Sequence, residues 1–363
     1  MSLVHKIGLT LIKNIGSRQA RKLLLAFDDA EAVFNAKKDD LLKIEGIGEK
    51  SATSILHTDA LIRAEKALAF IKKNKIDVLF YTDENYPKRL RNCYDAPILL
   101  YFKGKVDFNQ QRAVSIVGTR NATPYGKELC KRLIETLKAF DVLIVSGLAY
   151  GIDITAHKES LVTGISTVGV LGHGLDRIYP SSHTDIARSM VKKGGLLTEF
   201  LPGTSPDKEN FPKRNRIIAG LCDVLVVVEA SSKGGALITA DIANSYSRDV
   251  YAFPGRTTDE YSAGCNFLIK TNRAGLINHP QDLIYYLAWE GAKSVTSDIQ
   301  STLPLNLTEV EKLIVESLAT NALTIDELCL ITDHAQSKLA LAILTLEMQG
   351  IIISLPGKQY QLA

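Results

Sequence analysis

Short apolar segments alternate with amphipathic segments through the middle of the chain. The apolar segments are four or five residues long and rich in Val, Ile and Leu, as in strands that are buried on both faces of a sheet. They predict strands at residues 113–117, 142–145, 167–171, 195–199, 224–228 and 250–253, with helices between them at 125–140, 153–162, 183–193, 216–221 and 236–245. Because right-handed crossovers join neighbouring parallel strands, this order predicts an α/β fold with a doubly wound, Rossmann-like parallel sheet over residues 76–290.

A helical pattern with two glycine-centred turns precedes the sheet, over residues 1–75. The second turn contains Gly46 and Gly48 in the apolar-x-Gly-apolar-Gly order that is typical of a helix-hairpin-helix element in a SAM-like domain. Glycine permits the tight turn, and the N–H groups of the next helix would face a phosphate, with Lys50 adding a cation. A turn that only packs two helices together explains the same pattern equally well.

The residues after the sheet predict a linker and a winged-helix domain. Residues 288–302 are polar, and residues 303–363 then show three helical patterns and a hairpin. Thr308 and Glu311 have the spacing of a capping box at the first of these helices. The third helix, residues 335–349, carries one Lys, one Glu and no Arg, so we expect weak binding to duplex DNA and a protein contact instead.

Charge and cysteine content narrow the classes of function. The net charge of +3 divides into +4 over residues 1–82, +3 over 83–302 and −4 over 303–363, so a polyanion should bind the first two segments. The five cysteines lie far apart and indicate neither a disulfide framework nor a zinc site, and we expect no metal or cofactor. No signal peptide and no apolar run of about 18 residues is present, which predicts a cytoplasmic protein without a membrane partner.

Glycine-rich turns at the carboxyl ends of the strands are candidate binding loops. Gly118 and Arg120 follow the first strand, where neither a dinucleotide G-x-G-x-x-G nor a Walker motif occurs. Lys233, Gly234 and Gly235 precede a helix, a position that favours anion binding. The sequence therefore predicts a phosphate-binding edge of the sheet that lacks the fingerprint of NAD or ATP.

A basic, aromatic helix start adds to this edge. Phe211, Lys213, Arg214 and Asn215 follow one another closely in the sequence. Cations at a helix N-terminus oppose the macrodipole, so a ligand explains their presence better than a solvent-exposed turn does. An aromatic ring for stacking and cations for phosphates together suit single-stranded nucleic acid.

Four other polar residues are assigned structural roles. Asp153 and His157 are four residues apart on one helix, a spacing that would suit half of a metal site or an acid–base pair. No third ligand is evident, so we predict that Asp153 caps the helix and that His157 is hydrogen-bonded. Arg216 is a candidate buried structural partner for Glu229.

Several motifs of the central region occur together: Gly118-Thr119-Arg120, Ser146-Gly147-Leu148-Ala149, Gly151-Ile152-Asp153, Ala156-His157, Tyr179-Pro180, Phe211-Pro212 and Pro254-Gly255. With the basic segment between them, they resemble the DNA-processing protein A (DprA/Smf) family. The resemblance implies a homodimer that binds single-stranded DNA, protects incoming strands in natural transformation and loads the RecA recombinase, without catalytic turnover. It implies dimer contacts around residues 266–277.

The resemblance also places a single-strand pocket on this sequence. Its residues would be Gly118, Arg120, Phe211, Lys213, Arg214, Asn215, Lys233, Gly234 and Gly235, to which the helix-hairpin-helix reading adds Lys50. The third turn often reads Ser-Gly-Ser in the family and is Gly234-Gly235-Ala236 here, so a hydroxyl contact is lost while the backbone loop remains.

Two alternatives remain open. A more distant resemblance links the same edge to phosphoribohydrolase-like nucleotide-processing enzymes, which use a Gly-Gly phosphate loop and a nearby Glu. Glu229 precedes that loop here, whereas the acid follows it in those enzymes. A scaffold with a vestigial pocket is the other alternative.

Overall fold

The computed structural model describes the chain except residues 1, 111, 290–306, 320, 356–358 and 363. The chain divides into two compact units, residues 1–291 and 292–363. The larger unit contains the predicted sheet and the helices that precede it. The smaller unit contains the predicted winged-helix domain, while nearly all of the predicted linker lies outside the described residues.

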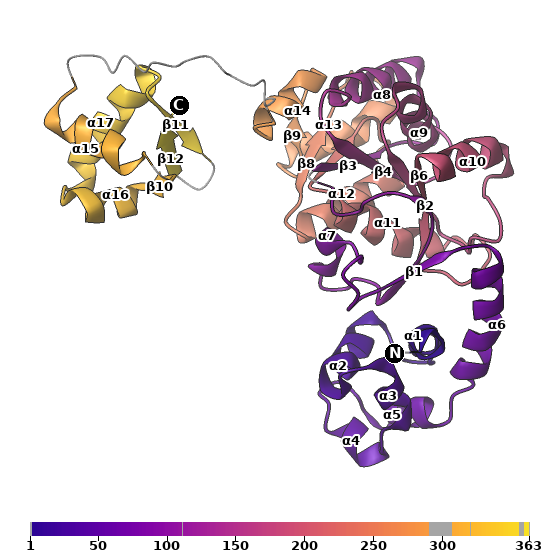
Figure 1. Cartoon of the computed structure of the whole chain (residues 1–363). Coiled ribbons are helices and arrows are strands. Elements are labelled where there is room, and N and C mark those ends of the chain that lie inside the picture. The colour runs from indigo at the N-terminus through magenta and orange to yellow at the C-terminus, as the bar shows by residue number, and fades with distance from the viewer. Residues whose placement is uncertain (1, 111, 290–306, 320, 356–358, 363) are drawn as a thin grey trace. The chain divides into compact units, whose positions relative to one another are not determined.

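The larger unit is organised around a nine-stranded sheet with the order β1-β2-β6-β5-β4-β3-β7-β8-β9 (Figure 1). Its strands are β1 (Asp77–Phe80), β2 (Leu99–Lys105), β3 (Arg112–Val117), β4 (Val142–Ser146), β5 (Thr167–Val170), β6 (Gly194–Thr198), β7 (Val224–Val227), β8 (Asp249–Ala252) and β9 (Gly275–Leu276). The seven strands β6, β5, β4, β3, β7, β8 and β9, in this order across the sheet, are parallel to one another. Strands β1 and β2 form an antiparallel pair, and β2 also pairs antiparallel with β6. The predicted doubly wound sheet is confirmed, and the segment before it adds an antiparallel edge.

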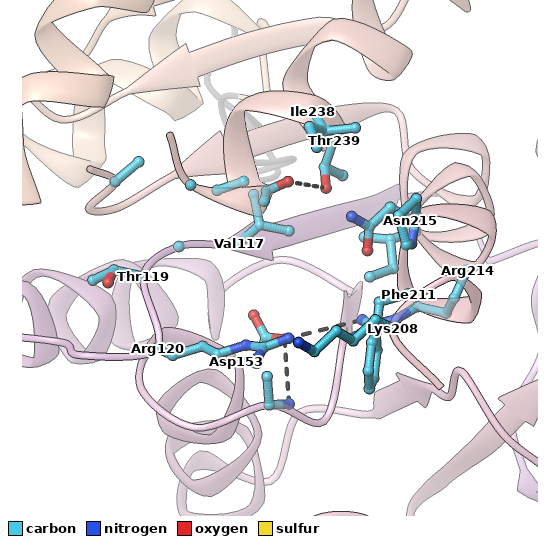
Figure 2. Close-up of a pocket in the computed structure, with 18 of the residues that line it drawn as sticks. Val117, Thr119, Arg120, Asp153, Lys208, Phe211, Arg214, Asn215, Ile238 and Thr239 are labelled. Atoms are coloured by element: carbon cyan, nitrogen blue, oxygen red, sulfur yellow. Dashed lines mark hydrogen bonds and ion pairs between the residues drawn. The ribbon is translucent and has the colours of Figure 1, made fainter. Parts of the chain in front are cut away.

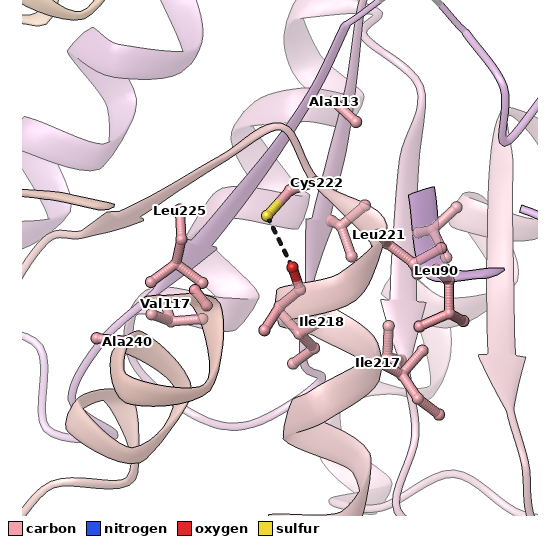
Figure 3. Packing of buried hydrophobic residues seen from close by; sticks show 14 of the residues in the cluster. Leu90, Ala113, Val117, Ile217, Ile218, Leu221, Cys222, Leu225 and Ala240 are labelled. Carbon is pink, nitrogen blue, oxygen red and sulfur yellow. Dashed lines mark hydrogen bonds between the residues drawn. The ribbon is translucent and has the colours of Figure 1, made fainter. Parts of the chain in front are cut away.

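Helices cover both faces of this sheet. One face is covered by α7 (Lys88–Arg91), α11 (Asn210–Leu221), α12 (Gly235–Ser245) and α13 (Ala263–Lys270), and the other by α8 (Pro124–Leu137), α9 (Ile152–Thr163), α10 (Thr184–Lys192) and α14 (Pro280–Tyr286). In the first core, Ile218 of α11 packs with Val117 of β3 and Leu225 of β7 (Figure 3). Full burial of such a side chain contributes roughly 1.5–3 kcal/mol, which fixes the strand ends that carry the loops.

Among the described residues, six helices precede the sheet. They are α1 (Leu3–Leu9), α2 (Ser17–Phe27), α3 (Ala30–Asn35), α4 (Lys38–Leu42), α5 (Glu49–Leu56) and α6 (Ala60–Lys73). The predicted glycine turns begin two of them, with Gly16 as the N-cap of α2 and Gly48 as the N-cap of α5. The helical core continues into the sheet, because Phe80 and Leu99 of the edge strands are buried in the same cluster.

The smaller unit has the predicted winged-helix order. It consists of α15 (Glu309–Ser317), β10 (Leu323–Thr324), α16 (Ile325–Thr332), α17 (Gln336–Met348), β11 (Ile352–Leu355) and β12 (Gln359–Leu362), and the sheet order is β10-β12-β11. The predicted capping box is confirmed, since Thr308 accepts a bond from the Glu311 N–H and Glu311 accepts one from the Thr308 N–H. The predicted hairpin turn at residues 356–358 lies outside the described part.

Candidate single-stranded nucleic-acid site

A cavity opens at the carboxyl edge of the sheet, where the chain reverses its direction of winding. The chain proceeds from β3 through β4 and β5 to β6 on one side, and then continues with β7 on the other side of β3. The loops that follow β3 and β7 therefore diverge, which is where open α/β sheets bind ligands. The cavity has a volume of about 640 Å³ and is lined by the β3 loop, the first turns of α11 and the start of α12 (Figure 2).

The cavity brings together most of the predicted pocket. Seven of the ten predicted residues line it: Gly118, Arg120, Phe211, Arg214, Asn215, Gly234 and Gly235. Lys213 and Lys233 are exposed and do not line the cavity, and Lys50 lies on α5 in the helical region before the sheet. Roles for these three lysines in binding remain predictions.

Among the other residues that line the cavity, Lys208 and Tyr179 can contact a ligand, although sequence reasoning did not assign them to the site. Lys208 lies just before α11, and its side chain gathers with those of Arg120 and Arg214 beside Asp153 (Figure 2). Tyr179 reaches the cavity from the loop after β5. The motif Tyr179-Pro180 could have indicated a role for Tyr179, but the sequence did not show that its loop folds over the site.

Arg120 and two aromatic rings form a stacking surface at the cavity. The Arg120 guanidinium lies 5.4 Å from the centroid of the Phe211 ring, and the Tyr179 ring lies 6.3 Å from the same ring. Arg120 is exposed, and no carboxylate of the described residues lies within ion-pairing distance of it. A planar cation beside aromatic rings can neutralise a phosphate and stack on a base at the same time.

Arg214 differs from Arg120 because it is buried. Only 5% of its surface is exposed, and its Nη1 lies 4.0 Å from Oδ2 of Asp153. Burial raises the pKa of Asp153 above its ordinary value, while Arg214 opposes this rise. A Cβ at Gly147 would lie 1.9 Å from Nη1 of Arg214, so only glycine leaves room for this pair. Arg214 thus supplies a fixed charge below the cavity surface.

The prediction that Asp153 caps α9 is wrong. The N-cap is Gly151, whose φ is +76°, and Asp153 lies in the first turn, where it accepts a bond of 3.4 Å from the Ala149 N–H. A Cβ at Gly151 would lie 2.1 Å from the carbonyl oxygen of Thr119, so only glycine fits this junction. Because the chain must turn at Gly151, this residue is the N-cap of α9. Asp153 then lies in the first turn with its carboxylate towards Arg214.

The start of α12 leaves backbone donors available. Gly234 is its N-cap, and no side chain of the described residues caps it. The first N–H groups of a helix have no partner within the helix, and the macrodipole favours an anion beside them. Gly234 and Gly235 line the cavity, so these donors can bind a phosphate there.

Glu229 and Arg216 do not pair, and that prediction is wrong. Glu229 accepts bonds from the Thr123 N–H at 2.9 Å and from its hydroxyl at 2.5 Å, and it does not line the cavity. Arg216 pairs instead with Glu199 and donates to the carbonyl of Asp95. Arg216 therefore lies on the side of α11 that faces the end of β6, where Glu199 is located. The carboxylate that the nucleotide-processing alternative requires is thus engaged at the start of α8.

The structural role predicted for His157 is confirmed. Its Nε2 lies 2.6 Å from the Gly147 carbonyl oxygen, to which Nε2–H donates, and its Nδ1 lies 2.7 Å from the Thr167 hydroxyl. Burial lowers the pKa of His157 to about 4. The ring is therefore neutral at neutral pH and holds the turn that contains Gly147 beneath the cavity.

We predict that the free energy of unfolding decreases as the pH is lowered, because His157 must be neutral in the folded state. Its pKa is about 4 when folded and 6.5 when exposed, so the unfolded chain binds more protons between these values. This group alone should lower the free energy of unfolding by about 2 kcal/mol between pH 7 and pH 5. Urea unfolding at both pH values measures it. The His157→Asn variant should lose most of the dependence, and an unchanged slope in that variant would contradict the assignment.

Other kinds of site are not found in the described part of the chain. No group of three or more His, Cys, Asp or Glu side chains there could hold a metal ion, and the cysteines are free. No helix among the described residues is long and apolar enough to cross a bilayer.

Comparisons with known proteins agree with this architecture. A family model described as DNA recombination-mediator protein A matches residues 77–288, and models described as a SAM-like helix-hairpin-helix tandem and a DprA winged helix domain match residues 7–57 and 300–358. Protein Smf of Synechocystis is 29% identical over 382 residues and is matched over 96% of both chains.

Two solved structures are similar as well. The X-ray structure of DNA processing protein A from Streptococcus pneumoniae aligns with a TM-score of 0.68 and 32% identity, over 78% of this chain and 97% of that one. DNA processing protein A from Helicobacter pylori, solved for its single-stranded DNA binding mode, aligns with a TM-score of 0.54 and 30% identity, over 59% of this chain and 96% of that one.

Proposed function

The chain belongs to the DNA recombination-mediator protein A family, and we propose that it binds single-stranded DNA in the cavity at the β3–β7 switch point. The observation that carries this proposal is the exposed Arg120 guanidinium beside the Phe211 ring, at the mouth of a cavity that also contains a free helix N-terminus. The single-stranded DNA binding of the Helicobacter pylori relative supports it.

In this proposal, different groups of the cavity bind the phosphates and the bases of the strand. Arg120 and Lys208 neutralise phosphates, and the N–H groups at the start of α12 bind a third phosphate. A base stacks on Phe211 or Tyr179, which every base can do because every base has a π-face. Binding is therefore tolerant of sequence, since phosphate contacts and stacking do not depend on the identity of the base.

We propose binding rather than catalysis as the role of this cavity. Asp153 is the only carboxylate among the described residues that line it, and it is ion-paired with Arg214. Glu229, the acid on which nucleotide cleavage would depend, is bonded to Thr123 instead. Release of free base from nucleoside monophosphates by the purified chain would overturn this assignment.

We further propose a homodimer that acts in recombination by loading the RecA recombinase on the strand. Phe267 and Leu276 lie in the segment for which dimer contacts are proposed and are 46% and 45% exposed, which supports an apolar interface there. The family description as a recombination mediator supports the recombinase step. Sedimentation of the purified chain tests the dimer, and recombinase filament formation on strands with and without this chain tests the loading.

The central test is the salt dependence of binding to a labelled oligothymidine and to a duplex of equal length. We expect tight binding to the single strand, with a slope of log affinity against log salt of about −0.7 for each phosphate contact. Binding to the duplex should be at least roughly tenfold weaker, because α17 of the acidic winged-helix domain exposes a single cation, Lys338, beside the apolar Leu341, Leu344 and Met348. Fluorescence anisotropy measures both. Equal or negligible binding to the two DNAs would contradict the proposal.

A further inference from the structure

A second groove lies beside the cavity and shares one residue with it. The groove has a volume of about 750 Å³ and is lined by the first turns of α8, by α9 and by Ser182 and His183. Arg120 lines both the groove and the cavity. The cavity and the groove therefore adjoin at Arg120.

The groove carries an excess of positive charge. Lys127, Lys131 and Lys158 line it and are exposed, and together with Arg120 they face two carboxylates, those of Glu128 and Glu159. Lys127 and Lys131 are four residues apart on α8 and so lie on the same face of the helix.

Two of these lysines have no ion-pair partner. In the part of the chain that is described, Lys127 and Lys158 form no ion pair, and Lys131 forms one with Glu135 at 4.0 Å, beyond hydrogen-bonding distance. Clustered cations without partners repel each other, which an anionic ligand would relieve. The spacing of the three along a groove suits a ligand with several negative charges rather than a single anion.

Tyr150 places an exposed aromatic ring between the cavity and the groove. Its side chain is 52% exposed, and its ring contacts His183 edge-on with the centroids 4.9 Å apart. The Ser182 hydroxyl donates to the Tyr150 hydroxyl at 3.2 Å, which fixes the ring position. Tyr150 also lines a small space of about 130 Å³ that Phe211 and Tyr179 line as well, so aromatic surface continues from the cavity to the groove.

We propose that a DNA strand bound in the cavity continues past Arg120 and Tyr150 into this groove, where Lys127, Lys131 and Lys158 bind its phosphates. This inference rests on the proposed function and extends it, because the site then holds a longer strand than the cavity alone accommodates. A single strand is the occupant because the path begins at a stacking surface that requires unpaired bases. A duplex cannot follow that path without separating.

The test compares a short strand with a longer one. The K127A/K131A/K158A variant and a K138A/K192A/K193A control remove the same charge, and the control lysines line neither site. Fluorescence anisotropy is measured with labelled dT6 and dT15 at several salt concentrations. For dT15, the groove variant should lose roughly 10- to 100-fold in affinity at 0.1 M salt, and its salt slope should become shallower by about 2. For dT6, its affinity should stay within about twofold of the unsubstituted chain.

The outcomes separate this inference from the function on which it rests. Three outcomes would overturn the proposal that the groove binds the strand while leaving the cavity as the binding site. They are unchanged dT15 binding by the groove variant, an equal loss of affinity for dT6, and an equal loss of affinity in the control variant. A loss for duplex but not for dT15 would assign the groove to double-stranded DNA and overturn the inference as well. Failure of the unsubstituted chain to bind either strand would overturn both proposals.

Discussion

Replacing Arg120 with alanine is expected to reduce the affinity for single-stranded DNA by roughly 10- to 100-fold without changing the fold. The side chain is exposed, forms no ion pair among the described residues and stacks near Phe211, so its loss removes a phosphate contact and a stacking partner together. It also lies where the cavity and the groove meet. Anisotropy with oligothymidine and with a mixed-sequence strand measures the effect, which should be the same for both.

A conservative variant separates charge from stacking at this position. Arg120→Lys keeps the cation but loses the planar guanidinium, so it should recover the salt slope and only part of the affinity. Arg132→Ala is the matched control, because Arg132 is exposed on α8 and lines neither the cavity nor the groove. If R120A binds within about twofold of the unsubstituted chain, the assignment of the site is wrong.

The second large effect is on stability. Asp153→Ala should lower the free energy of unfolding by roughly 3 kcal/mol or more, because it leaves the Arg214 guanidinium buried without its counter-charge. Urea unfolding can be followed by the fluorescence of Trp289, the single tryptophan of the chain. Trp289 lies 6.4 Å from Phe140 in ring-centroid distance and so reports on the larger unit.

A double variant tests the physical cause of that loss. In D153A/R214M the buried charge is removed together with its partner, so most of the lost stability should return. DNA binding should not return with it, since the fixed charge below the cavity is gone. A D153A variant that loses less than about 1 kcal/mol, or a double variant less stable than D153A, would show that the pair does not act as a buried ion pair.

The burial of Arg214 also changes which substitution probes binding. From the sequence, Arg120 and Arg214 are equivalent cations at the same edge. In the structure Arg214 is buried and Arg120 is exposed, so we expect a change at Arg214 to alter stability and binding at once and a change at Arg120 to alter binding alone. Arg120 is therefore the informative position.

The amino-acid sequence alone was enough to predict the architecture and the edge of the sheet at which the candidate site lies. Continuous apolar runs are enough to place buried parallel strands, because they must be covered on both faces wherever the chain leads them. Glycine-rich turns after those strands then fall at one edge by topology alone, which is why Gly118, Arg120, Phe211, Gly234 and Gly235 meet in one cavity.

The direction of each polar side chain depends on tertiary packing and could not be predicted from the sequence. Lys213 and Arg214 are neighbours in the sequence, yet one is exposed and the other is buried against Asp153. A helix turns each successive residue by about 100°, so the orientation of α11 against the sheet sets which cation enters the cavity. The groove of Lys127, Lys131 and Lys158 likewise exists only because α8 and α9 pack side by side, a contact between segments that no local pattern encodes.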